Sequence, residues 1–89
     1  MKTYEENLDI VIGNIREMLL KKNHDYGSEN LKKFGQYGIM VRLTDKISRL
    51  DNLLSGDRAM VKSETIDDTF MDIAGYAIQS LVLFDSESK

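Results

Sequence analysis

The chain has 89 residues, 42% of them hydrophobic, which is enough for one hydrophobic core and too few for two. Its formal net charge is -3, so it lacks the overall basic field that drives non-specific binding to nucleic acid, and we expect no nucleic-acid partner. It contains no cysteine, which excludes disulfide frameworks, thiolate metal sites and thiol nucleophiles. We therefore treat residues 1–89 as a single domain.

The sequence shows no pattern typical of a secretory leader or a membrane span. Residues 1–7 carry charges and lack the apolar run of a signal peptide. The most apolar stretch, residues 70–84, is interrupted by Asp72 and Gln79 and is shorter than the roughly 20 residues that a membrane span needs. The sequence predicts a soluble, cytoplasmic protein with no membrane partner, and residues 85–89 are predicted to form a disordered tail.

The first predicted helix covers residues 4–22. Side chains recur along it at intervals of three and four, which is the period of an α-helix. They are Tyr4, Leu8, Val11, Ile15, Met18 and Lys22. Thr3 and Glu6 have the spacing of a capping box, in which each side chain accepts a hydrogen bond from the backbone N–H of the other. We expect the helix to begin directly after Thr3.

Residues 23–38 are predicted to be a structured connection with a short helix over residues 28–34. The cluster His24-Asp25-Tyr26-Gly27 is interpreted as a turn at its start. His24 and Tyr26 are candidate ligand contacts, because their rings can stack on a nucleotide base, although a lone histidine is also typical of an ordinary turn. With one histidine and no cysteine, the chain is not expected to bind zinc.

The second main helix is predicted over residues 39–55, with Gly56 as a left-handed terminator. Its apolar residues repeat at helical spacing, and they are Ile39, Leu43, Ile47, Leu50 and Leu54. Its opposite face carries four charged residues, Arg42, Asp45, Lys46 and Arg49. Three cations with one carboxylate between them suit a phosphate clamp, in which arginine offers two parallel donors. The alternative is a solvated face with internal ion pairs.

The third main helix is predicted over residues 66–84, with Ser63 as its cap. Its apolar residues form two stripes: Ile66, Phe70, Ile73, Ala77, Leu81 and Phe84 in one, and Met71, Ala74, Ile78 and Val82 in the other. A helix that is apolar nearly all round must be buried nearly all round, and two other helices cannot enclose it. We therefore expect an all-α homo-oligomer that pairs through residues 66–84, most simply across a two-fold axis. Gly75 predicts a close approach by another backbone or by a ligand.

Carboxylates also recur on the third helix. Glu64, Asp68 and Asp72 lie on successive turns of one face, with Tyr76 following as a candidate base or ribose contact. Asp72 has apolar neighbours, and a carboxylate withdrawn from water needs a partner. Together the three carboxylates suit Mg²⁺ completed by substrate phosphates. Alternatively, Asp72 pairs with a cation of the second helix, namely Arg42, Lys46 or Arg49.

Four ordered segments carry a family resemblance: His24-Asp25-Tyr26-Gly27, Phe34-Gly35, residues 42–50 and residues 68–77. Together they resemble a small phage-associated family, nucleotide modification associated domain 1, over roughly residues 17–83. That family is in turn distantly similar to the all-α, MazG-type nucleoside triphosphate pyrophosphohydrolases, helical oligomers whose acidic residues hold Mg²⁺. Their acidic motif matches Glu64-Thr65-Ile66-Asp67, with Asp68 and Asp72 as alternatives, whereas the glutamates of their preceding helix are missing.

These patterns lead to three functional hypotheses. The first is a nucleotide-binding homo-oligomer in which Arg42, Lys46 and Arg49 engage phosphates, and Asp45, Asp68 and Asp72 hold a metal or orient those cations. In a phage it would serve nucleotide metabolism or sequester a host nucleotide signal in the host cytoplasm. The second is a Mg²⁺-dependent pyrophosphohydrolase with no assigned catalytic residue. The third is a protein-interaction module that uses its apolar third helix.

Overall fold

The fold consists of four helices, and the structure, a computed structural model, describes residues 1–56 and 63–84. Helix α1 spans Tyr4–Tyr26, α2 spans Glu29–Lys32, α3 spans Gly35–Ser55 and α4 spans Ser63–Leu83. For residues 63–65 the backbone alone is described. No strand occurs in the described ranges, so the predicted all-α class is confirmed. The predicted tail, residues 85–89, lies outside them.

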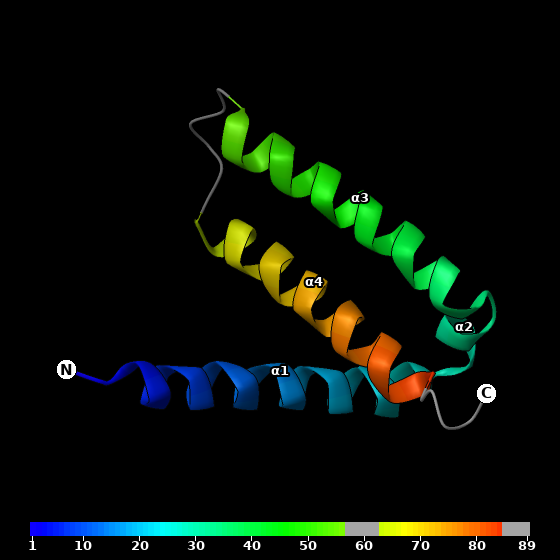
Figure 1. The fold of residues 1–89 in the computed structure, drawn as a ribbon, viewed down its shortest axis with the longest axis horizontal. Helices are drawn as coiled ribbons and strands as arrows, with labels where there is room; N and C mark the ends of the chain where they lie inside the picture. The colour runs from blue at the N-terminus through cyan, green and yellow to red at the C-terminus, as the bar shows by residue number, and fades with distance from the viewer. Residues whose placement is uncertain (57–62, 85–89) are drawn as a thin grey trace.

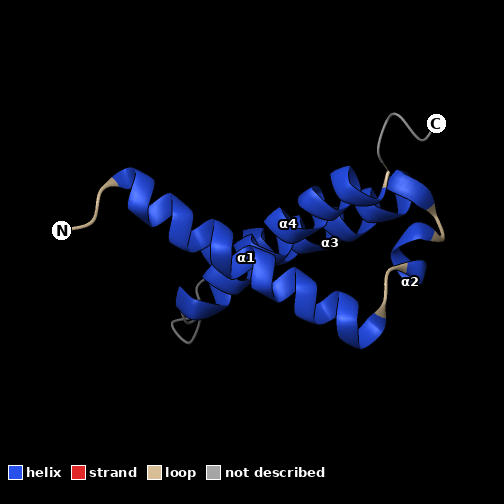
Figure 2. Cartoon of the chain, turned by 90° about the horizontal axis from the view of Figure 1, so that it is seen from below, coloured by secondary structure: helices blue, strands red, loops and turns tan. Residues whose placement is uncertain are grey.

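Helix α4 lies between α1 and α3 (Figure 1). α3 and α4 run side by side in opposite directions, and α2 connects the end of α1 to the start of α3. Helix α1 crosses α4 at an angle (Figure 2), and Met18 and Leu19 of α1 lie against Gly75 of α4. This arrangement concentrates the contacts of α1 in its second half.

The start of α1 agrees with the prediction, and its end does not. In the capping box, the Thr3 N–H donates to Glu6 Oε1 at 2.8 Å and the Glu6 N–H donates to Thr3 Oγ1 at 3.1 Å. The helix continues four residues past the predicted end, so His24-Asp25-Tyr26 is its last turn and not a loop. Gly27 stops it with φ 73° and ψ -177°, a conformation open essentially to glycine, and its N–H donates to the Asn23 carbonyl.

The second main helix, α3, ends at Ser55 as predicted, but its start and the conformation of Gly56 differ from the prediction. It begins at Gly35, four residues earlier than predicted. The prediction that Gly56 is a left-handed terminator is wrong, because Gly56 has φ -73° and ψ 153° and leaves the helix in an extended conformation. The short helix predicted between the first two main helices is confirmed as α2. Helix α4 begins at Ser63, the predicted cap, whose side chain is not described.

The described core is small. The buried aliphatic residues are Ile15 on α1 and Ile39 and Leu50 on α3, with Thr69 of α4 buried beside them. Ile47 and Leu54 belong to the predicted core stripe of α3 and yet are exposed. The radius of gyration is 15.0 Å, compared with about 12 Å for a compact domain of this length. Within the ranges described, no helix is long and apolar enough to cross a membrane.

Gly13, within α1, and Gly27, directly after it, together test whether the glycine that ends the helix contributes to stability. An added Cβ would have open space at both Gly13 and Gly27, but only Gly27 has a positive φ. We expect Gly27→Ala to lower the free energy of unfolding by about 2 kcal/mol, because alanine is strained in this conformation. We expect the control, Gly13→Ala, to raise it by up to about 1 kcal/mol. Urea denaturation followed by circular dichroism measures both, and equal effects would contradict the prediction.

Candidate functional site

A pocket of about 440 Å³ lies beside the point where α1 crosses α4. Helix α1 contributes the largest share of its wall, and α2, α3 and α4 complete it. Its charged and aromatic lining residues are Lys22, Arg42, Asp72, Tyr26 and Tyr76. Its amide-bearing residues are Asn23, Asn30 and Gln79, and its remaining wall is formed by Met18, Leu19, Gly27, Leu31 and Gly75. The pocket is therefore mixed in character, with charge and aromatic rings in one cavity.

Asp72 is the centre of an ionic cluster that connects three helices. Its Oδ2 lies 3.1 Å from Lys46 Nζ of α3, and its Oδ1 lies 3.6 Å from Lys22 Nζ of α1. The Asp72 side chain is 26% exposed, compared with 31% for Lys46 and 52% for Lys22. Because Asp72 and Lys46 are mostly shielded from water, their attraction is screened less than that of a surface pair.

The pocket end of this cluster carries excess positive charge. Lys22 and Arg42 line the pocket against one carboxylate, Asp72, and Lys46 lies behind that carboxylate. Three cations thus face a single negative charge. A hollow lined mainly by one sign of charge attracts ligands of the opposite sign, so the pocket favours an anion.

The structure brings together about half of the residues proposed from sequence. Tyr26, Arg42, Asp72 and Tyr76 all line the pocket, and Lys46 adjoins it through Asp72. The others do not line it. Asp45, Arg49 and Asp68 are exposed, and the side chain of His24 is 89% exposed with its Nδ1 at 3.2 Å from Asp25 Oδ1. The side chain of Glu64 lies outside the described residues.

The carboxylates do not gather into a metal site in the part of the chain that is described. No group of three His, Cys, Asp or Glu side chains there is close enough to hold an ion. Both oxygens of Asp72 face lysine ammonium groups, and a divalent cation in their place would meet two like charges. The arrangement at Asp72 therefore does not fit Mg²⁺, and the predicted magnesium site remains a prediction.

Sequence reasoning missed four polar residues of the pocket: Lys22, Asn23, Asn30 and Gln79. One signal was available for Lys22, because it continues the apolar stripe of α1 at a position typical of a core residue. A cation at such a position needs a buried partner, and Asp72 is that partner. Asn23 and Asn30 carry no comparable signal, since amides are common near helix ends.

A close approach does occur at Gly75, but the approaching groups are side chains and neither another backbone nor a ligand. A Cβ at this buried position would lie 3.1 Å from Met18 Cε and 3.2 Å from Leu19 Cδ2. Gly75 thus lets the side chains of α1 pack directly on the backbone of α4, at the wall of the pocket. The approaching groups belong to this chain.

Comparison with known proteins gives one match. A family model described as nucleotide modification associated domain 1 matches residues 22–83, a range that contains every described residue of the pocket except Met18 and Leu19. No curated protein and no solved structure matches the chain.

The two lysines that hold Asp72 should contribute unequally to stability. We expect the coupling energy between Asp72→Asn and Lys46→Met to be about 1 kcal/mol. The coupling energy between Asp72→Asn and Lys22→Met should be only a few tenths of a kcal/mol, because Lys22 is farther from Asp72 and more exposed. Double-mutant cycles by urea denaturation give both values. Equal couplings, or a larger one for Lys22, would show that the cluster is not centred on α3 and α4.

Proposed function

This chain belongs to the nucleotide modification associated domain 1 family, and we propose that it binds a phosphorylated nucleotide in the pocket between α1 and α4. The observation that carries the proposal is the presence, in one cavity, of two cationic side chains, Lys22 and Arg42, and two tyrosines, Tyr26 and Tyr76. Phosphates require cations, and bases require flat apolar surfaces.

The phosphate end of the ligand lies at Arg42 and Lys22. The Arg42 guanidinium is half-buried and offers two parallel N–H donors to phosphate oxygens. Lys22 supplies a second positive charge from the opposite side of the pocket. Asp72 acts as the internal counter-ion in the absence of ligand, because it holds the ammonium groups of Lys22 and Lys46. An entering phosphate competes with this carboxylate for Lys22.

The base end of the ligand lies at the two tyrosines. Tyr26 is among the most exposed aromatic residues of the chain, although it lines a pocket, so its ring is available for stacking on a base. The amides of Asn23, Asn30 and Gln79 offer both donors and acceptors to base edges. The volume of about 440 Å³ lies in the range of small-molecule sites.

The geometry supports binding without cleavage. Asp72 is the one carboxylate that lines the described pocket, and each of its oxygens faces a lysine. Without ligand, both oxygens are therefore engaged by lysines, whereas a general base must accept a proton from the attacking water. The proposal includes no step through Mg²⁺. Retention of an intact nucleotide suits sequestration better than turnover.

Arg42 and Arg49 form a matched pair for testing the pocket. Both are on α3 and were proposed from sequence as phosphate contacts, but only Arg42 lines the cavity. We expect Arg42→Gln to raise the Kd for the best nucleotide of a mono-, di- and triphosphate panel by about tenfold, and Arg49→Gln to leave it unchanged. Isothermal titration calorimetry measures both. No binding across the panel, or equal losses, would refute the proposed site, and released pyrophosphate would favour the hydrolase hypothesis.

Asp72→Asn separates the role of counter-ion from that of metal ligand. If Asp72 only neutralises the lysines, its removal frees two ammonium groups and lowers the Kd for the nucleotide several-fold. We expect this gain with and without Mg²⁺. A loss of binding confined to solutions containing Mg²⁺ would instead identify Asp72 as a metal ligand, and circular dichroism verifies that the variant is folded.

A further inference from the structure

An apolar groove of about 460 Å³ adjoins the pocket, between α1 and the C-terminal half of α4. Ile12 and Leu20 of α1 and Ile78 and Val82 of α4 line it, and all four are exposed. Leu19, Asn23 and Gln79 line both the groove and the pocket. Whatever covers the groove therefore also forms an edge of the proposed nucleotide site.

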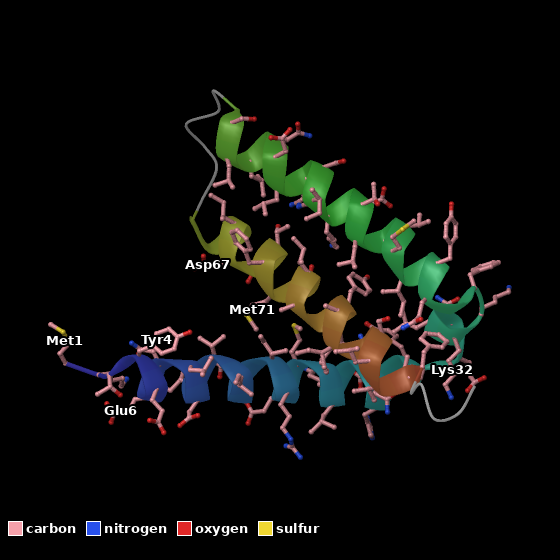
Figure 3. All side chains as sticks on the ribbon, viewed as in Figure 1. Met1, Tyr4, Glu6, Lys32, Asp67 and Met71 are labelled. Carbon is pink, nitrogen blue, oxygen red and sulfur yellow. The ribbon has the colours of Figure 1, made fainter. Side chains whose placement is uncertain are left out.

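The same chain carries a helical segment that lacks contacts of its own. Every residue from Tyr4 to Asn14 in α1 is exposed, and this half of the helix projects away from the other helices (Figure 2). Figure 3 shows Tyr4 on the side of α1 that faces α4, and Glu6 on the opposite side. This segment, residues 4–14, is the α1 arm, and its apolar side chains, among them Leu8, Val11 and Ile12, are exposed.

The accessible surface is larger than that of a compact monomer. It measures 7215 Å², whereas a monomer of this mass exposes about 5300 Å².

Charge along α1 indicates how two copies would be oriented. The α1 arm contains Glu5, Glu6 and Asp9 and no cation. The following residues, 15–23, contain Arg16, Lys21 and Lys22 against a single acid, Glu17. An antiparallel pair of α1 helices places the acidic half of each opposite the basic half of the other, which a parallel pair cannot do.

We propose that two copies of this chain pair through antiparallel α1 helices, with the α1 arm of each covering the groove of the other. The two-fold axis passes near Ile12, because Tyr4 and Leu20 each lie eight residues, about 12 Å, from it. Such an interface is isologous, with one patch serving both copies. The arm of the second copy then reaches Leu20, one turn from Asn23, and closes the open edge of the pocket.

Two isoleucines give a matched test of this interface. Ile12 is 53% exposed and lines the groove, whereas Ile10 is 44% exposed and does not line it. In sedimentation velocity without nucleotide, we expect the wild type and Ile10→Glu to be dimers and Ile12→Glu to be a monomer, because its two glutamates would face each other at the axis. A monomeric wild type would overturn the proposal, as would an equal effect of both substitutions. The outcome does not depend on the proposed function.

A second variant keeps the test valid if Ile12→Glu fails to fold. The chain has no cysteine, so a single introduced thiol can form a disulfide only between copies. We expect Ile12→Cys to form a covalent dimer on mild oxidation, since residues at the axis lie close together, and Asn14→Cys, on the opposite face of α1, to remain largely uncrosslinked. Equal crosslinking of the two variants, or none at residue 12, would overturn the proposed register.

Discussion

Asp72 of α4 connects this central helix to both of its neighbours through ion pairs. Only three aliphatic residues of the described chain are buried, and just one of them, Ile15, belongs to α1. The carboxylate of Asp72 receives Lys46 from α3 and Lys22 from α1, so a single side chain of the central helix fixes both neighbours. Removing one partner of a shielded pair leaves the other charge uncompensated, which costs more than the pair itself contributes. The small core makes this cost a large share of the stability.

The same charges give the pocket its preference for anions. Two lysines exceed what one carboxylate can neutralise, and Arg42 adds a third positive charge. A phosphate that enters the pocket relieves the repulsion among these cations while competing with Asp72 for Lys22. Ligand binding and helix packing therefore both use the ammonium group of Lys22. The affinity of the site then depends on how firmly α1 is held against α4.

The sequence predicted the helices more accurately than the contacts between them. The helical periods and the Thr3-Glu6 capping box located α1 and α3, and the apolar surroundings of Asp72 required a cation partner, of which Lys46 was one candidate. His24 was misplaced because Gly27, three residues later, is the actual stop of α1. Arg42 and Arg49 share a helical face, yet only Arg42 reaches the pocket, because the pocket lies beside the point where α1 crosses α4 at an angle. That angle depends on packing and on Lys22, which no local pattern specifies.

The uneven burial of α4 links the pocket to the proposed dimer. A helix with two apolar stripes was expected to be enclosed, and within one chain Phe70, Ile78, Leu81 and Val82 are nevertheless exposed. Ile78 and Val82 line the groove that the α1 arm of a second copy would cover. Leu19, Asn23 and Gln79 line both the groove and the pocket, so an arm that covers the groove would also border the anion site. Pairing of two copies and enclosure of the anion site would then involve the same stretch of α1.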